Sequence, residues 1–224
     1  MPPEAGSTHV FPWVWEITET LVREFGCQRL GNKRNPFNEL LYILLSSKTP
    51  PDRYQEVYGT LRRTYKRADD LADARPEEVA SVIIHGGLQN RKAHAIAAIA
   101  QRLHQEFGRV TLSPLKRMTN EEAERFLVSF PEVSKKTARC VLMYALGRPV
   151  FPVDTHCFRI AQRLGWVPEG VSLTDRRADE LQEGVPESLR WDLHVGMVLL
   201  GRCYCLPQDP LCCKCPLSGF CDYV

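Results

Sequence analysis

Long apolar runs are missing from this sequence. None is longer than seven residues, whereas a membrane-spanning helix needs about 20. The first residues have neither the basic start nor the apolar core of a signal peptide. We therefore expect a soluble intracellular protein, cytoplasmic or nucleoid-associated, that has no membrane partner.

Charge of one sign is also lacking. The 29 Lys and Arg residues nearly balance the 27 Asp and Glu residues, and the formal net charge is only +2. A surface for nucleic acid must therefore come from local clustering of basic residues. One such cluster is the segment 134–148, which has no acidic residue. We expect its basic side chains to form a docking face, and they are Lys135, Lys136, Arg139 and Arg148.

The alternation of apolar and polar residues that marks strands is absent as well. Apolar residues recur at helical spacing instead, most clearly in the segment 90–107. A capping box at Thr119 and Glu122 marks the start of another helix. Further helices are expected at 10–25, 37–45, 135–146, 155–164 and 189–200. The pattern predicts an all-α protein, and 224 residues allow one large domain or two small ones.

Cysteine, in contrast, is abundant and unevenly placed. Six of the nine cysteines lie in the last 22 residues. An odd number cannot be fully paired within one chain, and an intracellular setting favours a metal site over disulfides. The best set of ligands, spaced C-x6-C-x2-C-x5-C, is Cys205, Cys212, Cys215 and Cys221. Four thiolates can hold a structural zinc ion or a 4Fe–4S cluster, and the spacing leaves both open. Cys203 and Cys213 are expected to be bystanders.

Lys136 and Asp154 form a second pattern that points to chemistry. Lys136 lies at the start of the expected helix 135–146, where the helix dipole and desolvation both lower the pKa of an amine. A neutral amine is a nucleophile and can form a Schiff base. Asp154 lies at an expected N-cap, where the dipole favours the ionised carboxylate. Taken singly, such a lysine is usually only solvated and such an aspartate usually only a cap.

Together these features resemble the endonuclease III family of helix-hairpin-helix DNA glycosylases, which carry an iron–sulfur cluster loop. The segment 130–138 is similar to the family hairpin Leu-Pro-Gly-Val-Gly-x-Lys-Thr-Ala. The segment 153–159 is similar to the family's catalytic-aspartate motif, and the cysteine spacing is similar to that of its cluster loop. The segments 44–46 and 87–93 match further family positions, and the resemblance covers about residues 10–223.

The resemblance implies a fold of two all-α lobes with duplex DNA between them. A six-helix barrel domain with the hairpin would span 29–148, and a discontinuous cluster domain would combine 1–28 with 149–224. The resemblance favours a 4Fe–4S cluster over zinc at the four cysteines. It also implies a monomer whose partner is double-stranded DNA containing a damaged base or an abasic site.

The implied function is base excision repair by a DNA glycosylase with AP lyase activity, acting on oxidised pyrimidines. Lys136 would attack the sugar C1′ and form a Schiff base, and Asp154 would assist it. The DNA-binding residues implied are Lys48, Leu88, Val133, Ser134, Lys135 and Thr137. Leu88 takes the place of a wedge inserted into the base stack, although a buried core leucine is the alternative. Lys48 replaces a gap-filling glutamine, and a lysine there can reach a phosphate instead.

The hairpin and the cluster loop depart from the family pattern. Glu132 and Ser134 replace the two hairpin glycines, and the loop 206–211 has no basic residue. A non-glycine residue at positive φ costs about 1–2 kcal/mol, and the Glu132 carboxylate would lie near a phosphate. We expect weaker backbone binding than in typical members. The alternatives are a glycosylase for uracil or thymine mismatches, a lyase with little glycosylase activity, a DNA-binding paralogue without efficient catalysis, and a redox or scaffold protein.

Overall fold

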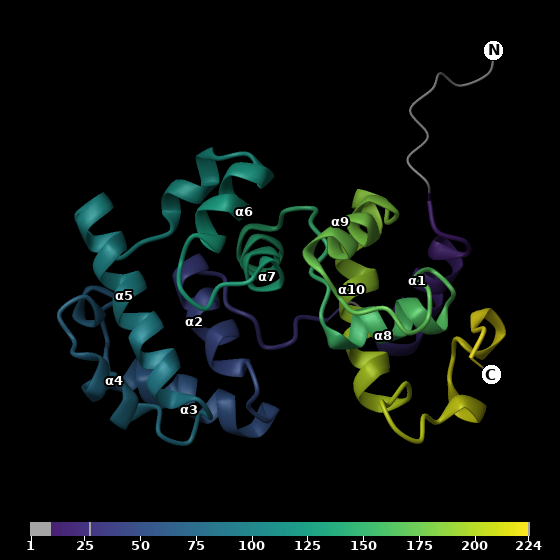
Figure 1. Cartoon of the computed structure of the whole chain (residues 1–224), viewed down its shortest axis with the longest axis horizontal. Helices are drawn as coiled ribbons and strands as arrows, with labels where there is room; N and C mark the ends of the chain where they lie inside the picture. The colour runs from purple at the N-terminus through teal and green to yellow at the C-terminus, as the bar shows by residue number, and fades with distance from the viewer. Residues whose placement is uncertain (1–9, 27, 224) are drawn as a thin grey trace, which may run out of the picture. The chain divides into compact units, whose positions relative to one another are not determined.

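The computed structural model describes residues 10–26 and 28–223, and every regular element in that part of the chain is a helix (Figure 1). The expected all-α class is therefore confirmed. The α-helices are α1 (Val14–Phe25), α2 (Pro36–Ser46), α3 (Pro51–Thr64), α4 (Pro76–Val82), α5 (Gln89–Phe107), α6 (Asn120–Val128), α7 (Lys135–Leu146), α8 (Thr155–Arg163), α9 (Asp175–Glu183) and α10 (Arg190–Cys203). Short 3-10 turns are η1 (Asp69–Leu71), η2 (Ser113–Arg117), η3 (Glu187–Leu189), η4 (Cys212–Lys214) and η5 (Ser218–Phe220).

Helix starts follow the local signals in the sequence. Thr119 and Glu122 form the expected capping box at α6. Two expectations differ from the structure. Helix α1 begins at Val14 rather than at residue 10, because Trp13 has a left-handed backbone with φ +57°. Helix α9 was not expected, because only two of its nine residues are buried and its apolar period is faint.

The chain divides into two compact units. One is Gly31–Arg148, and the other combines Met1–Leu30 with Pro149–Val224. The Gly31–Arg148 unit holds α2–α7, and α7 packs against both α2 and α6. Helix α2 is buried on nearly every face, as expected of an apolar block, and Asn35 caps it by accepting the Asn38 N–H at 3.0 Å.

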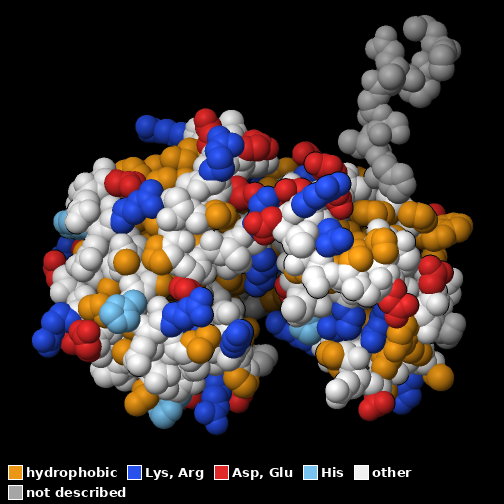
Figure 2. All heavy atoms as spheres, viewed as in Figure 1, with side chains coloured by type: hydrophobic (Ala, Val, Ile, Leu, Met, Phe, Trp, Pro, Cys, Tyr) orange, Lys and Arg blue, Asp and Glu red, His pale blue; other side chains and the backbone are white. Residues whose placement is uncertain are grey.

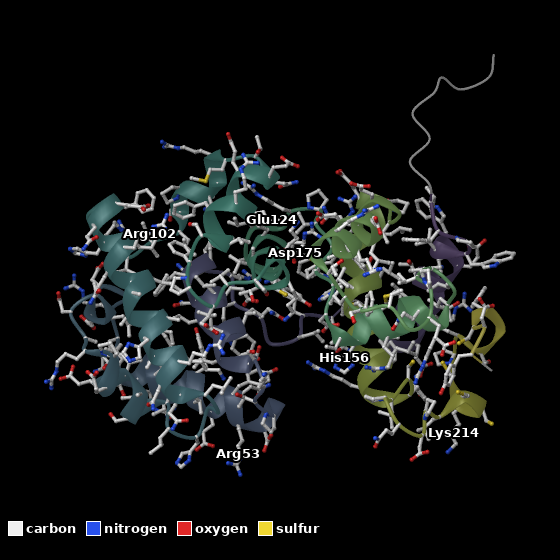
Figure 3. The ribbon with its side chains drawn as sticks, in the orientation of Figure 1. Arg53, Arg102, Glu124, His156, Asp175 and Lys214 are labelled. Atoms are coloured by element: carbon white, nitrogen blue, oxygen red, sulfur yellow. The ribbon has the colours of Figure 1, made fainter. Side chains whose placement is uncertain are left out.

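In the other unit, α1 and α8 both pack against α10. Two glycines of α10 make these contacts possible. A Cβ at Gly196 would lie 2.6 Å from the Cβ of Leu21 on α1, and a Cβ at Gly201 would lie 2.5 Å from Nδ1 of His156 on α8. Real Cβ atoms do not approach so closely, so both glycines set how near these helices come. Figure 3 labels His156 on α8.

Candidate functional site

The segment 130–138 joins α6 to α7, as the sequence predicted. Ser134 is the N-cap of α7, and its Oγ accepts the Thr137 N–H at 3.3 Å. Lys136 is the second residue of the helix and is half-buried. Lys136 therefore belongs to the first turn of α7. The Val133 and Thr137 side chains are buried, so only their backbone can face a large ligand.

Glu132 takes the left-handed conformation that glycine normally takes in such a hairpin. Its φ is +61°, as expected. The Nε of Arg91, on the first turn of α5, donates to Glu132 Oε1 at 2.7 Å. The Glu132 side chain, which stands where the family has glycine, is thus paired with the Arg91 guanidinium and holds it beside the hairpin.

The basic cluster at 134–148 is only partly a surface feature, so the expected docking face is wrong for two of its members. Arg139 is 2% exposed, and its Nε donates to Glu124 Oε2 at 2.7 Å. Arg148 donates to the Met118 and Thr119 carbonyls at 2.8 and 2.9 Å. The sequence segment lacks acids, but α6 supplies Glu124 by tertiary packing (Figure 3). Basic and acidic side chains are likewise interspersed on the face shown in Figure 2.

Glu39 is a titratable residue that the sequence analysis missed. It is fully buried in α2, where its carboxylate accepts from the Asn32 side chain and the Lys33 backbone N–H. Burial raises the pKa of Glu39 to about 7, and the charges of Lys33 and Lys136 act in the opposite direction. The proposed nucleophile therefore lies within electrostatic reach of a carboxyl that titrates near neutrality. The apolar run around Glu39 offered no signal of this beyond the presence of one acid.

Lys48 and Leu88 lie in the Gly31–Arg148 unit, on loops that precede α3 and α5. Both side chains are exposed, and both backbones are left-handed, with φ +50° and φ +53°. Leu88 is 46% exposed. The alternative of a buried core leucine is therefore wrong, and the role of Leu88 as a wedge stays a prediction.

Asp154 is the N-cap of α8, as predicted. Its Oδ1 accepts two backbone N–H groups, from His156 and Cys157, each at 2.9 Å. Donors aimed at one carboxylate oxygen favour its ionised form, and they fix the side chain on the helix terminus. Lys136 and Asp154 belong to different units, and their pairing stays a prediction.

The four cysteines of the C-terminal loop line one cavity, whereas Cys203 and Cys213 are exposed. Arg163 Nη1 on α8 donates to Cys205 Sγ at 3.0 Å. Burial raises the pKa of Cys215 and Cys221, and the neighbouring thiols oppose their ionisation further. Four thiolates gathered here would need a compensating cation, so the residue types are those of a metal centre. In the described residues, no three ligating side chains are close enough to hold a single metal ion.

Comparison with known proteins agrees with this geometry. The family model described as "HhH-GPD superfamily base excision DNA repair protein" matches residues 41–187. Endonuclease III of Thermotoga maritima is 30% identical over 208 residues, covering 93% of this chain and 92% of that protein. Endonuclease III of Bacillus subtilis is 31% identical over 188 residues, covering 84% and 81%. The chain belongs to the HhH-GPD superfamily of base excision DNA repair proteins, and its resemblance to endonuclease III is confirmed.

Comparison of the fold with solved structures also matches endonuclease III. A non-covalent endonuclease III–DNA complex and a trapped endonuclease III–DNA covalent intermediate each match with a TM-score of 0.80 and 26% identity, covering 94% of both chains. An Arabidopsis thaliana protein named as a DNA glycosylase is 34% identical over 199 residues, and the match spans 66% of its length. None of the described helices is long and apolar enough to cross a membrane.

Proposed function

We propose that this protein is a bifunctional DNA glycosylase and AP lyase that removes oxidised pyrimidines from duplex DNA. The observation that carries the proposal is the position of Lys136, half-buried in the first turn of α7 and directly after the hairpin. An amine at such a position is activated as a nucleophile. Monofunctional base removal with water as nucleophile would not require it.

The reaction begins when a damaged pyrimidine leaves the helix, which costs a few kcal/mol and least for a damaged base. The neutral Nζ of Lys136 forms a bond to C1′, while the base leaves with the electron pair of its glycosidic bond and takes up a proton. Opening of the sugar ring gives an iminium ion between Lys136 and C1′. Loss of a C2′ proton then expels the 3′ phosphate, and water hydrolyses the imine to release the enzyme.

Asp154 stabilises the positive charge that develops on the sugar as the base leaves. A fixed carboxylate does this without reorganising, and its two backbone donors hold Oδ1 in place. Ser134 and Lys135 would contact the DNA backbone at the hairpin, with the backbone of Val133 and Thr137. Leu88 would enter the stack as a wedge, and Lys48 would reach a phosphate.

The four cysteines would hold a 4Fe–4S cluster, with zinc as the alternative. Such a cluster supplies a structural cross-link and takes no part in the steps above. Two contacts anchor the cysteine loop to the rest of its unit. Leu217 is 1% exposed and belongs to the core, and the Cys205 N–H donates to the Leu200 carbonyl at 2.8 Å. We further propose that the Gly31–Arg148 unit serves as the barrel lobe and the other unit as the cluster lobe.

Borohydride trapping tests the function directly. Wild-type protein is incubated with duplexes carrying an abasic site, thymine glycol, uracil or a G·T mismatch, and the adducts are separated on denaturing gels. We expect adducts with the abasic site and with thymine glycol, because the abasic site offers an aldehyde at C1′ directly and thymine glycol offers C1′ to the lysine once its base has been displaced. Adducts with the abasic site and with uracil or the mismatch, but none with thymine glycol, would favour the mismatch glycosylase. Binding without any adduct would favour the DNA-binding paralogue.

Replacing Glu132 with glycine is expected to tighten DNA binding several-fold and to stabilise the protein by about 1 kcal/mol. Glycine has no penalty at φ +61°, and the substitution removes a carboxylate from the expected phosphate site. Loss of the exposed pair with Arg91 costs little. Fluorescence anisotropy and thermal unfolding measure the two effects.

Glu132→Gln separates charge from backbone strain, because glutamine keeps the strain and lacks the charge. It should show the gain in DNA affinity without the gain in stability. Weaker DNA binding by Glu132→Gly than by wild type would mean that the pair with Arg91 preorganises the hairpin instead.

A further inference from the structure

Lys92 is a buried lysine to which the proposed reaction gives no role. It lies in the first turn of α5 and is 4% exposed. Its Nζ is within hydrogen-bond distance of four oxygens: the carbonyls of Leu45, Ser47 and Gly86 at 2.9, 2.8 and 2.5 Å, and Thr49 Oγ1 at 2.9 Å. An ammonium has three N–H donors, so this group is fully satisfied.

The partners of Lys92 are unusual for a buried cation. All four are neutral oxygens, three from the backbone and one from a hydroxyl. Burial lowers the pKa of Lys92 to about 8, while the four acceptors stabilise the charged form. Desolvating a charge without a counter-ion is costly. The hydrogen bonds from the ammonium to these four oxygens have to offset that desolvation cost, and in making them Lys92 holds the oxygens together.

The oxygens belong to two separate segments, of which one is the end of α2 with the loop that follows and the other is the loop before α5. Leu45, Ser47 and Thr49 lie where α2 leads into α3, and Gly86 lies just before α5. The loops also touch directly, because Thr49 Oγ1 donates to the Gly86 carbonyl at 2.7 Å. A Cβ at Gly87 would lie 3.1 Å from the Lys48 carbonyl oxygen. Lys92 therefore fastens two segments that approach one another at backbone distance.

These two loops carry Lys48 and Leu88. Each residue is exposed and has a left-handed backbone that its side chain disfavours. Such strain persists only where the surroundings hold it, and it is typical of functional sites. The Lys92 N–H also donates to the Leu88 carbonyl at 3.0 Å, which ties the strained residue to the same helix turn.

We propose that Lys92 is a positioning residue that locks the two loops together, so that Lys48 and Leu88 enter duplex DNA at the same base step. The inference rests on the proposed function, because it assumes that both side chains meet DNA. Leu88 can unstack bases only if its loop does not yield, and the ammonium of Lys92, together with the hydrogen bond from Thr49 to Gly86, restrains that loop.

A double-mutant cycle tests the coupling. The ligand is a duplex with a tetrahydrofuran abasic analogue, which cannot form a Schiff base, and 2-aminopurine beside the analogue reports unstacking. Leu88→Ala should weaken binding about tenfold and reduce the fluorescence rise. Lys92→Met should do the same, and the double variant should be no worse than Lys92→Met. Lys116→Met, at an exposed lysine, should behave as wild type.

Fold-changes that multiply in the double variant would overturn the inference, because a merely structural role for Lys92 leaves the effect of Leu88 intact. Lys92→Met leaves buried carbonyls unpaired, so Thr49→Val provides a milder cycle that removes one acceptor and the bridge to Gly86. It should show the same coupling to Leu88. If wild-type protein does not prefer the analogue to undamaged duplex, the proposed function is overturned as well. If wild type does prefer the analogue and the effects of the two substitutions simply multiply, only this inference is overturned.

Discussion

Lys136→Ala is expected to lose the borohydride-trapped adduct on every duplex, by about a thousandfold or more. The substitution removes the only atom proposed to bond to C1′, and alanine is a good helix former in the first turn of α7. Binding to a duplex with a tetrahydrofuran analogue should change only modestly, since one cation is lost. Trapping and anisotropy on the same preparations measure both quantities.

Lys135→Ala is the matched control, because it removes a neighbouring amine from the same helix turn. The Nζ of Lys135 lies 3.6 Å from Glu124 Oε1. Because Lys135 is proposed to contact the DNA backbone and not C1′, its substitution should alter DNA affinity and leave trapping largely intact. Equal loss of trapping in both variants would contradict the assignment of the nucleophile. Persistence of the adduct in Lys136→Ala would place the Schiff base on another amine.

Cys212→Ser is expected to abolish cluster assembly and to lower the unfolding temperature strongly. Wild-type protein purified without oxygen should contain about four iron atoms per chain and absorb visible light. Serine leaves one iron without a thiolate, and metal binding contributes directly to folding free energy. Metal analysis, visible absorbance and thermal unfolding measure the loss.

Cys213→Ser changes the adjacent residue of the same short turn, η4, and provides the control. Cys213 is exposed, whereas Cys212 lines the cavity with the other three cysteines. Cys213→Ser should therefore keep its iron and its stability. Equal effects of the two substitutions would contradict the ligand set, and one zinc atom in place of iron would establish the zinc alternative.

Local features were predictable because their causes are local. The capping box of α6, the N-cap at Asp154 and the bounds of α7 depend on residues three or four positions apart. The left-handed backbone of Glu132 could also be expected, because the hairpin needs positive φ whatever residue occupies it. The helix α9 was missed since few of its residues face the core.

Side-chain partners beyond the helix caps were not predictable, because they come from distant segments. The run 134–148 contains no acid, yet Arg139 is buried against Glu124 of α6. Lys92 stood within a recognised motif, but its four oxygens lie up to 47 residues away along the chain. Nothing near Glu39 in the sequence indicates that burial raises its pKa to about 7.

The sequence by itself determined the helical class and the family, and it singled out the residues proposed to carry the chemistry, since helical periodicity, cap residues and motif spacing are written along the chain. Only the tertiary structure decided that Leu88 is exposed, that Arg139 and Arg148 are occupied internally, and that Lys92 joins two loops. The reason is physical: burial and hydrogen bonding depend on which helices pack together, and charge patterns along one segment do not contain that information.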